Sequence, residues 1–165
     1  MHSEAWDWIA TYATDEAISV LDIGGRITTD DPRELFPNAT YTGLDILPGD
    51  GVDIVADATT WNPKGRRWDI VLAAEVFEHT PAWRSICNTA WIALRSGGLF
   101  IITTAAPGRP PHSAIDGQEL RDGEYYRNIK PNDLQITLQR FGFTEIIVRE
   151  LPQTRDVRAI ARKGD

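Results

Sequence analysis

Glycines and acidic residues close three apolar runs in the first third of the chain, and their spacing predicts a ligand site. The apolar run 20–23 is followed by Gly24 and Gly25, and two later strand-like runs end at Asp45 and Asp57. An open α/β sheet binds its ligands at the carboxyl ends of its strands, so we expect these residues to lie along one edge. Carboxylates accept hydrogen bonds from hydroxyls and amines, which predicts a ligand that carries such groups and some positive charge.

The apolar run Trp68–Ala74 leads into a second acidic group that includes a histidine. Glu75, Glu78 and His79 form the pattern Glu-x-x-Glu-His. An inverted zinc motif has His at the first position, where this chain has Glu, so we expect no metal site here. His79 is a candidate general base, with a structural role at the start of the next helix as the alternative.

A long segment punctuated by glycine and proline, residues 105–130, carries further candidates. Connections of this length inside a compact domain are usually functional or mobile, so we expect a lid on the substrate side of the site. Its candidate bases are His112 and Asp116, and its candidate substrate contacts include Tyr125 and Tyr126. The alternative is a polar surface loop whose two aromatic residues pack into the core.

Length and composition limit the class of protein. A chain of 165 residues, 42% hydrophobic and 25% charged, is expected to fold as one domain over residues 1–165. The net charge of −7 and the scattered Lys and Arg argue against a nucleic-acid partner. The chain lacks a bilayer-spanning apolar run and a secretory signal, and it has one cysteine, so we expect a cytoplasmic protein with no membrane partner. That cysteine, Cys87, lies in an apolar helical stripe and is expected to belong to the core.

Apolar periodicity and turn residues give the order of the elements that position these groups. Helices are expected over residues 3–10, 80–94 and 131–141, with a short one inside 26–38. Strands are expected over 18–23, 40–46, 52–56, 68–74, 99–103, 144–151 and 156–162. The last two strands are joined by the short connection Pro152–Arg155, which cannot form a parallel crossover, so this pair must be antiparallel.

Several segments of the chain match the pattern of a known family: VLDIGG, YTGLDI, VADAT, WDIVLAAEVFEHT, LRSGGLFIIT and the final hairpin. Over nearly its whole length the chain resembles class I S-adenosylmethionine-dependent methyltransferases, especially small bacterial or phage-type members of the broad type 11 group. The resemblance implies an α/β, Rossmann-like three-layer sandwich. Its sheet would have seven strands, mostly parallel, with an antiparallel last strand inserted beside the fifth.

The resemblance also implies roles for individual residues, with S-adenosyl-L-methionine as the cofactor. Asp45 would bind the ribose hydroxyls, with a solvated turn residue as the alternative, and Asp57 with Ala58 would contact the adenine, with a helix cap as the alternative. The implied cofactor-binding residues are Asp22, Gly24, Gly25, Arg26, Asp45, Ile46, Asp57, Ala58 and Glu75, among which Asp22 organises the loop. The implied substrate contacts are Phe77, His112, Tyr125 and Tyr126, and the candidate catalytic bases are His79, His112 and Asp116.

The glycine loop departs from the family pattern. That pattern reads Asp-x-Gly-x-Gly-x-Gly, whereas Arg26 and Thr28 stand at its second and third glycine positions. Glycine is favoured there because the backbone turns tightly and approaches the ligand. Arg26 either binds the ligand carboxylate through its guanidinium or is an exposed residue on a rearranged turn.

The implied activity is methyl transfer from S-adenosylmethionine to an oxygen or nitrogen of a small molecule or a protein, by in-line displacement. One alternative is a non-catalytic binding module with the same fold, which the missing glycines favour. Another is an NAD-dependent oxidoreductase, which the absence of a G-x-G-x-x-G loop disfavours. Neither the acceptor nor the oligomeric state follows from the sequence.

Overall fold

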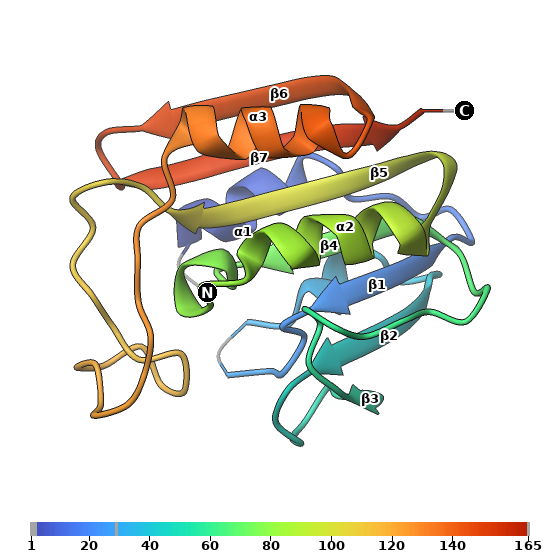
Figure 1. Cartoon of the computed structure of the whole chain (residues 1–165). Helices are drawn as coiled ribbons and strands as arrows, with labels where there is room; N and C mark the ends of the chain where they lie inside the picture. The colour runs from blue at the N-terminus through green and yellow to red at the C-terminus, as the bar shows by residue number, and fades with distance from the viewer. Residues whose placement is uncertain (1–2, 29, 165) are drawn as a thin grey trace.

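Seven strands form one mixed sheet in the order β3-β2-β1-β4-β5-β7-β6 in a computed structural model that describes residues 3–28 and 30–164 (Figure 1). The strands are β1 (Ser19–Ile23), β2 (Thr40–Asp45), β3 (Ile54–Val55), β4 (Trp68–Ala74), β5 (Leu94–Ala105), β6 (Phe143–Leu151) and β7 (Asp156–Lys163). The first five strands are parallel, and β7 runs antiparallel to both β5 and β6. The sheet therefore confirms the predicted seven-stranded topology, including an antiparallel last strand beside the fifth.

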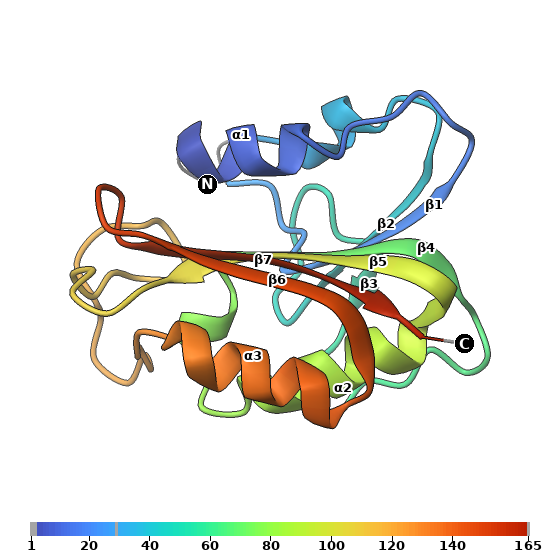
Figure 2. The same ribbon diagram turned by 90° about the horizontal axis from the view of Figure 1, so that it is seen from above.

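Helices cover both faces of the sheet, which gives the predicted three layers (Figure 2). Helix α1 (Ser3–Ala10) lies on one face, and α2 (Trp83–Ala93) and α3 (Pro131–Arg140) lie on the other. A short 3-10 helix, η1 (Pro32–Leu35), stands where a short helix was expected after β1, and the Asp31 side chain caps it by accepting a hydrogen bond from the Arg33 amide. None of the described helices is both long and apolar enough to cross a membrane.

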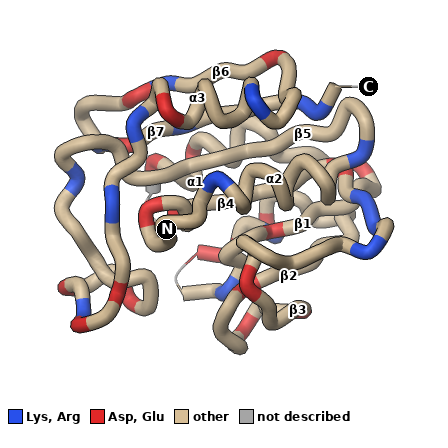
Figure 3. The backbone as a smooth tube through the Cα atoms, in the orientation of Figure 1, with Lys and Arg blue, Asp and Glu red and all other residues tan. Residues whose placement is uncertain are grey.

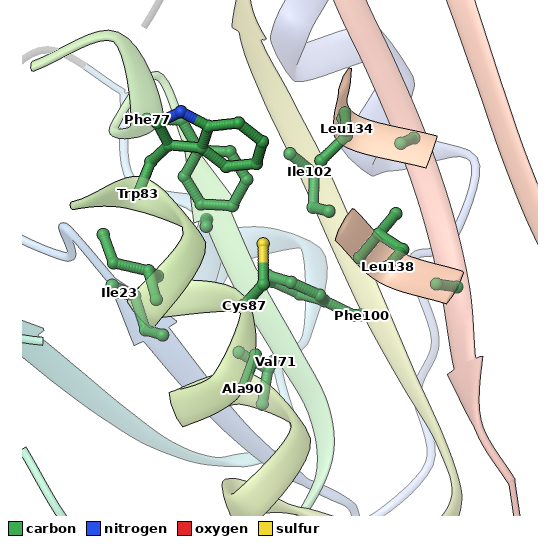
Figure 4. Close-up of a cluster of buried hydrophobic side chains, with 14 of the residues drawn as sticks. Ile23, Val71, Phe77, Trp83, Cys87, Ala90, Phe100, Ile102, Leu134 and Leu138 are labelled. Atoms are coloured by element: carbon green, nitrogen blue, oxygen red, sulfur yellow. The ribbon is translucent and has the colours of Figure 1, made fainter. Parts of the chain in front are cut away.

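Alternation along the central strands divides the core between the two faces. In β1, Val20 packs with the cluster under α1, whereas Leu21 and Ile23 join the larger cluster under α2 and α3. Cys87 is fully buried in that larger cluster beside Phe100 and Leu138 (Figure 4). Burial raises the pKa of its thiol, so Cys87 is an inert core residue as predicted.

Two strands differ from their expected bounds by more than one residue. Strand β5 begins at Leu94 rather than Leu99, because Leu94 pairs with Trp68 before the register shifts at the turn that contains Gly97. Strand β3 shrinks to Ile54–Val55, because only two of its residues pair with the end of β2. Both differences lie in connections and leave the carboxyl ends of β1, β2 and β4 at one edge of the sheet.

Candidate active site

A cleft of about 1250 Å³ lies at the carboxyl edge of the parallel strands. Its walls are the turns after β1, β2, β3 and β4 together with part of the long segment 105–130. Figure 1 shows that segment, in yellow to orange, at the same end of the sheet as the arrowheads of β1, β2 and β4. Pockets for one small ligand are usually about 300–1,000 Å³, so this cleft has room for a ligand and a second reactant.

The first wall of the cleft, called the donor wall below, consists of the turns after β1, β2 and β3. Its glycine turn packs directly on β2. The amides of Gly24 and Gly25 both donate to the Leu44 carbonyl, at 2.8 and 3.2 Å. Gly24 has φ +82°, and a Cβ on Gly25 would lie 2.9 Å from the Asp22 carbonyl oxygen and 3.0 Å from the Gly43 Cα. Packing alone therefore requires glycine at both positions.

The departure at Arg26 and Thr28 is matched by glycines on the neighbouring loop. The Ile27 amide donates to the Asp50 carbonyl at 2.9 Å, which places the β1 turn against the β2–β3 loop. A Cβ on Gly51 would lie 2.7 Å from the Ile27 side chain, and one on Gly49 would lie 2.9 Å from Arg26 Cδ. Glycines at positions 49 and 51 therefore leave room for the side chains of Arg26 and Ile27 on the β1 turn.

Arg26 reaches across the cleft opening to the long segment. Its Nη2 donates to the Ile115 carbonyl at 3.3 Å, and the side chain is partly buried. Both residues line the cleft. Arg26 is thus more than an exposed turn residue, because it joins the donor wall to the expected lid.

Asp45 and Asp57 are held at the cleft by short local turns. Asp45 Oδ1 accepts a hydrogen bond from the Leu47 amide at 2.9 Å, and Asp57 Oδ1 accepts one from the Thr59 amide at 2.8 Å. Each turn fixes its carboxylate and leaves further acceptor positions on the same group. Ile46, beside Asp45, is 64% exposed and also lines the cleft, as does Ala58 beside Asp57. Carboxylates beside an exposed apolar side chain suit a ligand that joins hydroxyls to a flat ring.

Asp22 lies deeper than the other acids of this wall. Its side chain is 5% exposed and accepts a hydrogen bond from the Tyr41 hydroxyl at 2.8 Å. Burial raises the pKa of Asp22 to about 7, against the lowering effect of that hydrogen bond. This position fits the predicted role in organising the loop.

The opposite wall, called the acceptor wall below, consists of the turn after β4 and the segment 105–130, and it contains a buried charge cluster. Arg109 Nη1 lies 2.8 Å from Glu75 Oε2 and 2.6 Å from Asp156 Oδ1, and Asp156 also pairs with Arg158 at 3.4 Å. Glu75 has φ +57°, an uncommon conformation for a residue other than glycine. The cluster joins β4, the long segment and β7 into one unit behind the cleft.

Glu78 is fully buried next to this cluster. Its Oε2 accepts a hydrogen bond from the Thr104 hydroxyl at 2.7 Å, and its Oε1 accepts one from the Ala105 amide at 3.1 Å. Burial and the nearby charge of Glu75 raise the pKa of Glu78. The sequence indicated Glu78 only as part of a rejected metal motif.

Three rings pack together at the mouth of the acceptor wall. The centroids of His79 and His112 are 5.1 Å apart, and Tyr126 lies 5.4 Å from the first and 4.9 Å from the second. Both histidines line the cleft. Burial, followed by the neighbouring His112, lowers the pKa of His79 to about 4, so its imidazole is neutral at pH 7. A neutral imidazole can accept a proton or bind a metal ion.

The other predicted residues fall in three places. Asp116 lines the cleft but is exposed and paired with Arg121. Tyr125 lies outside the cleft, in a small cavity of about 100 Å³ beside Arg84. Phe77 was expected to contact the acceptor, but it is 0% exposed and stacks on Trp83 in the core, because the 3-10 helix η2 (Phe77–His79) turns it under the sheet (Figure 4).

Arg109 and Asp156 could not be recognised from the sequence as members of the site. They contact each other across 47 positions, and neither lies in a recognised motif. The proximity of the Glu78, His79 and His112 side chains was also not predicted from the sequence. Among the described residues these three offer ligand atoms that all lie within 4.8 Å of one another. The expectation of no metal considered only the local Glu-x-x-Glu-His spacing and not a histidine from the long segment.

Comparison with known proteins gives a consistent family. A family model described as a methyltransferase domain matches residues 1–147. Two solved structures share the fold. A 1,6-didemethyltoxoflavin-N1-methyltransferase from Burkholderia thailandensis is 18% identical with a TM-score of 0.72, covering 99% of this chain and 78% of that one. An S-adenosylmethionine-dependent methyltransferase from Mesorhizobium loti is 17% identical with a TM-score of 0.72, covering 97% and 98%.

A relative found by sequence is a ubiquinone biosynthesis O-methyltransferase from Methylobacterium nodulans. It is 33% identical over a match that covers 54% of this chain. The match spans 41% of the length of that relative, so the two proteins share part of their sequence.

Proposed function

The chain belongs to this methyltransferase-domain family, and on that premise we propose that it transfers a methyl group from S-adenosylmethionine to an oxygen or nitrogen of a small-molecule or protein acceptor. The observation that carries this proposal is the alignment of Gly24, Gly25, Asp45 and Asp57 along one wall of the cleft. Class I methyltransferases bind their donor at this edge of the sheet, and Gly24, Asp45 and Asp57 stand at positions that match the family pattern, whereas Gly25 stands at a variable position.

The donor wall fits the cofactor. Asp45 would hold the ribose hydroxyls through the carboxylate that its turn with Leu47 fixes in place. Asp57 and Ala58 would contact the adenine, and the exposed Ile46 would cover its ring. The glycine turn and Arg26 would hold the amino-acid part of the donor. When bound, S-adenosylmethionine supplies a methyl group on a sulfonium. After transfer of this methyl group, the remainder of the donor leaves as a neutral thioether.

The acceptor wall supplies groups that can accept a proton from an attacking hydroxyl or amine. His79 and His112 line the cleft opposite the donor wall. A pKa of about 4 leaves the His79 imidazole neutral at pH 7 but also makes it a weak base. Asp116 also lines the cleft, but its ion pair with Arg121 engages the carboxylate on an exposed turn. The histidines are therefore the stronger base candidates.

The segment 105–130 would close the reaction off from water. Alignment of donor and acceptor and exclusion of solvent supply much of the rate of an in-line displacement. Residues 109–119 form the outer side of the cleft, and the contact from Arg26 to Ile115 joins them to the donor wall.

The charge distribution favours a small molecule or a protein as the acceptor. Figure 3 shows Lys and Arg dispersed over many elements rather than gathered in one stripe. Binding of a nucleic acid normally requires clustered positive charge to neutralise phosphates.

Calorimetric titration of the intact chain with S-adenosylmethionine, S-adenosylhomocysteine and NAD tests the proposal. We expect one molecule of each sulfur compound to bind per chain and NAD to give no signal. Binding of NAD alone would favour an oxidoreductase. Absence of binding by all three compounds to the folded protein would favour a non-catalytic module.

A further inference from the structure

Three side chains of the acceptor wall lie close enough together to share one metal ion. Glu78, His79 and His112 each offer one ligand atom, and these atoms lie within 4.8 Å of one another. Two come from the turn after β4 and the third from the segment 105–130. The chain therefore brings together two imidazoles and a carboxylate from separate parts of its sequence.

Hydrogen bonds and ring packing hold these three side chains in place. The Nδ1 of His112 faces the Pro110 carbonyl at 3.2 Å, so donation from this nitrogen leaves the Nε2 lone pair for a ligand. The Thr104 hydroxyl and the Ala105 amide orient the Glu78 carboxylate. Each oxygen of that carboxylate accepts one of these hydrogen bonds and has a second lone pair. Such outer partners are typical of metal sites.

The charges and buried atoms around the cluster favour a cation. Glu78 is 0% exposed, and the hydroxyl and the amide that donate to it are both neutral. The nearby guanidinium of Arg109 is engaged by Glu75 and Asp156. The Nδ1 of His79 is buried, and no hydrogen bond to it is found among the described residues. A buried carboxylate needs a counter-charge and a buried nitrogen needs a partner, and one cation would serve both.

We propose that Glu78, His79 and His112 bind one divalent transition-metal cation, such as Zn²⁺, Co²⁺ or Mn²⁺. Imidazole nitrogen favours these ions over Mg²⁺, which prefers oxygen ligands. Three protein ligands leave coordination positions open, and both histidines line the cleft, so these positions face the second reactant.

The proposed cation also restricts the chemical class of the methyl acceptor, an inference that rests on the proposed function. A cation on the acceptor wall would bind an oxygen of the acceptor and lower the pKa of its hydroxyl, as bound metal ions do for water. The histidines then act as ligands rather than as bases. The proton of the bound hydroxyl would pass to water, and its oxygen would attack the methyl carbon while the sulfur keeps the bonding pair and leaves as a neutral thioether. The acceptor class that fits is a hydroxyl compound, so transfer would occur to oxygen.

Titration of the chelator-treated protein with Co²⁺, followed by visible absorption, tests the site. We expect one Co²⁺ per chain with a Kd of about 10 µM or below, displaced by Zn²⁺ and not by an equal concentration of Mg²⁺. His79→Ala and His112→Ala should each weaken binding at least about 10-fold, since loss of even an outer partner has that effect. His2→Ala removes the remaining histidine, which lies outside the described residues, and should leave binding unchanged.

Three results would overturn the proposed site. These are no saturation below about 1 mM Co²⁺, equal binding by wild type and by a folded His112→Ala variant, and displacement by equal Mg²⁺. Circular dichroism of each variant confirms that it is folded. S-adenosylhomocysteine binding by the same samples tests the proposed function separately, because the donor wall contains none of the three ligands.

Discussion

The two walls of the cleft hold their charged groups in opposite ways. On the donor wall, Asp45 and Asp57 are partly or fully exposed, and each is fixed by an amide two positions further along the chain. On the acceptor wall, Glu75, Arg109 and Asp156 are largely buried and contact one another across long sequence separations. A ligand common to a family can be bound by short local motifs, whereas an individual acceptor site depends on tertiary contacts.

Loss of Arg109 should have the largest effect, because it breaks the charge cluster of the acceptor wall. Arg109→Leu leaves the carboxylates of Glu75 and Asp156 buried without this partner, at an expected cost of about 3–5 kcal/mol in the free energy of unfolding. Urea denaturation measures that cost. The matched control is Arg121→Leu, whose ion pair with Asp116 is exposed to solvent and should contribute little to stability. Equal losses in the two variants would contradict the difference between buried and exposed pairs.

Loss of Asp45 should affect binding rather than folding. Asp45→Ala removes the proposed acceptor of the ribose hydroxyls, and hydrogen bonds to a charged group contribute about 1.5–3 kcal/mol each. We therefore expect S-adenosylhomocysteine to bind roughly 10- to 100-fold more weakly, as measured by calorimetry. Asp50→Ala makes the same change on the same loop, at a residue outside the cleft lining, and should retain wild-type affinity. A wild-type affinity for Asp45→Ala would remove this residue from the cofactor site.

The buried acid of the donor wall should make stability depend on pH. The pKa of Asp22 is about 7 in the folded chain against 3.8 for an unperturbed group, so folding favours its protonated form. This stabilisation is complete below about pH 4 and is lost as the pH rises from about 4 to 7, a change on the order of 4 kcal/mol. Asp22→Asn keeps an acceptor for the Tyr41 hydroxyl and should flatten this part of the profile.

Asp69, near the start of β4, provides a control because its pKa is shifted in the opposite direction to that of Asp22. Although burial acts the other way, hydrogen bonds from Ser19 lower the pKa of Asp69. Its contribution is present at neutral pH and is lost as the pH falls. Asp69→Asn should therefore lower stability at pH 7 and have a progressively smaller effect as the pH falls. If the stabilities of the Asp22 and Asp69 variants changed with pH in the same direction, the opposite pKa shifts assigned to these two acids would be wrong.

Arg26 should give the smallest effect, since it lies at the junction of the two walls. Its guanidinium is partly buried and donates to the Ile115 carbonyl. An ion pair to the donor carboxylate at such a position is worth up to about 1 kcal/mol, so Arg26→Ala should weaken S-adenosylhomocysteine binding about 3- to 5-fold. Arg66→Ala, an exposed arginine outside the cleft lining, serves as the charge control. If Arg26→Ala binds S-adenosylhomocysteine with wild-type affinity, Arg26 does not bind the donor, and its role is the contact with the long segment.

The fold and the donor wall could be predicted because their signals are local. Apolar runs, the acids that end β2 and β3, and the short connection before β7 each lie within a few residues of one another. The sequence could not show how the chain accommodates Arg26, because the glycines that leave room for Arg26 and Ile27 lie at 49 and 51 on another loop.

The acceptor wall could not be predicted because its contacts join distant segments. The partners of Arg109 come from β4 and β7, and His112 meets His79 only when the long segment folds over the cleft. Phe77 shows the same limit. Val76 and His79 line the cleft, while a single turn of 3-10 helix places the Phe77 ring in the core.

Amide chemical shifts recorded while S-adenosylhomocysteine is added to the intact ¹⁵N-labelled protein test the division of the cleft most directly. We expect the largest changes at Gly24 and Gly25, at residues 45–47 and at residues 57–59, with none along the hairpin of β6 and β7. Changes confined to residues 105–130, or no changes in the folded protein, would contradict the assignment of the donor to the wall formed by β1, β2 and β3.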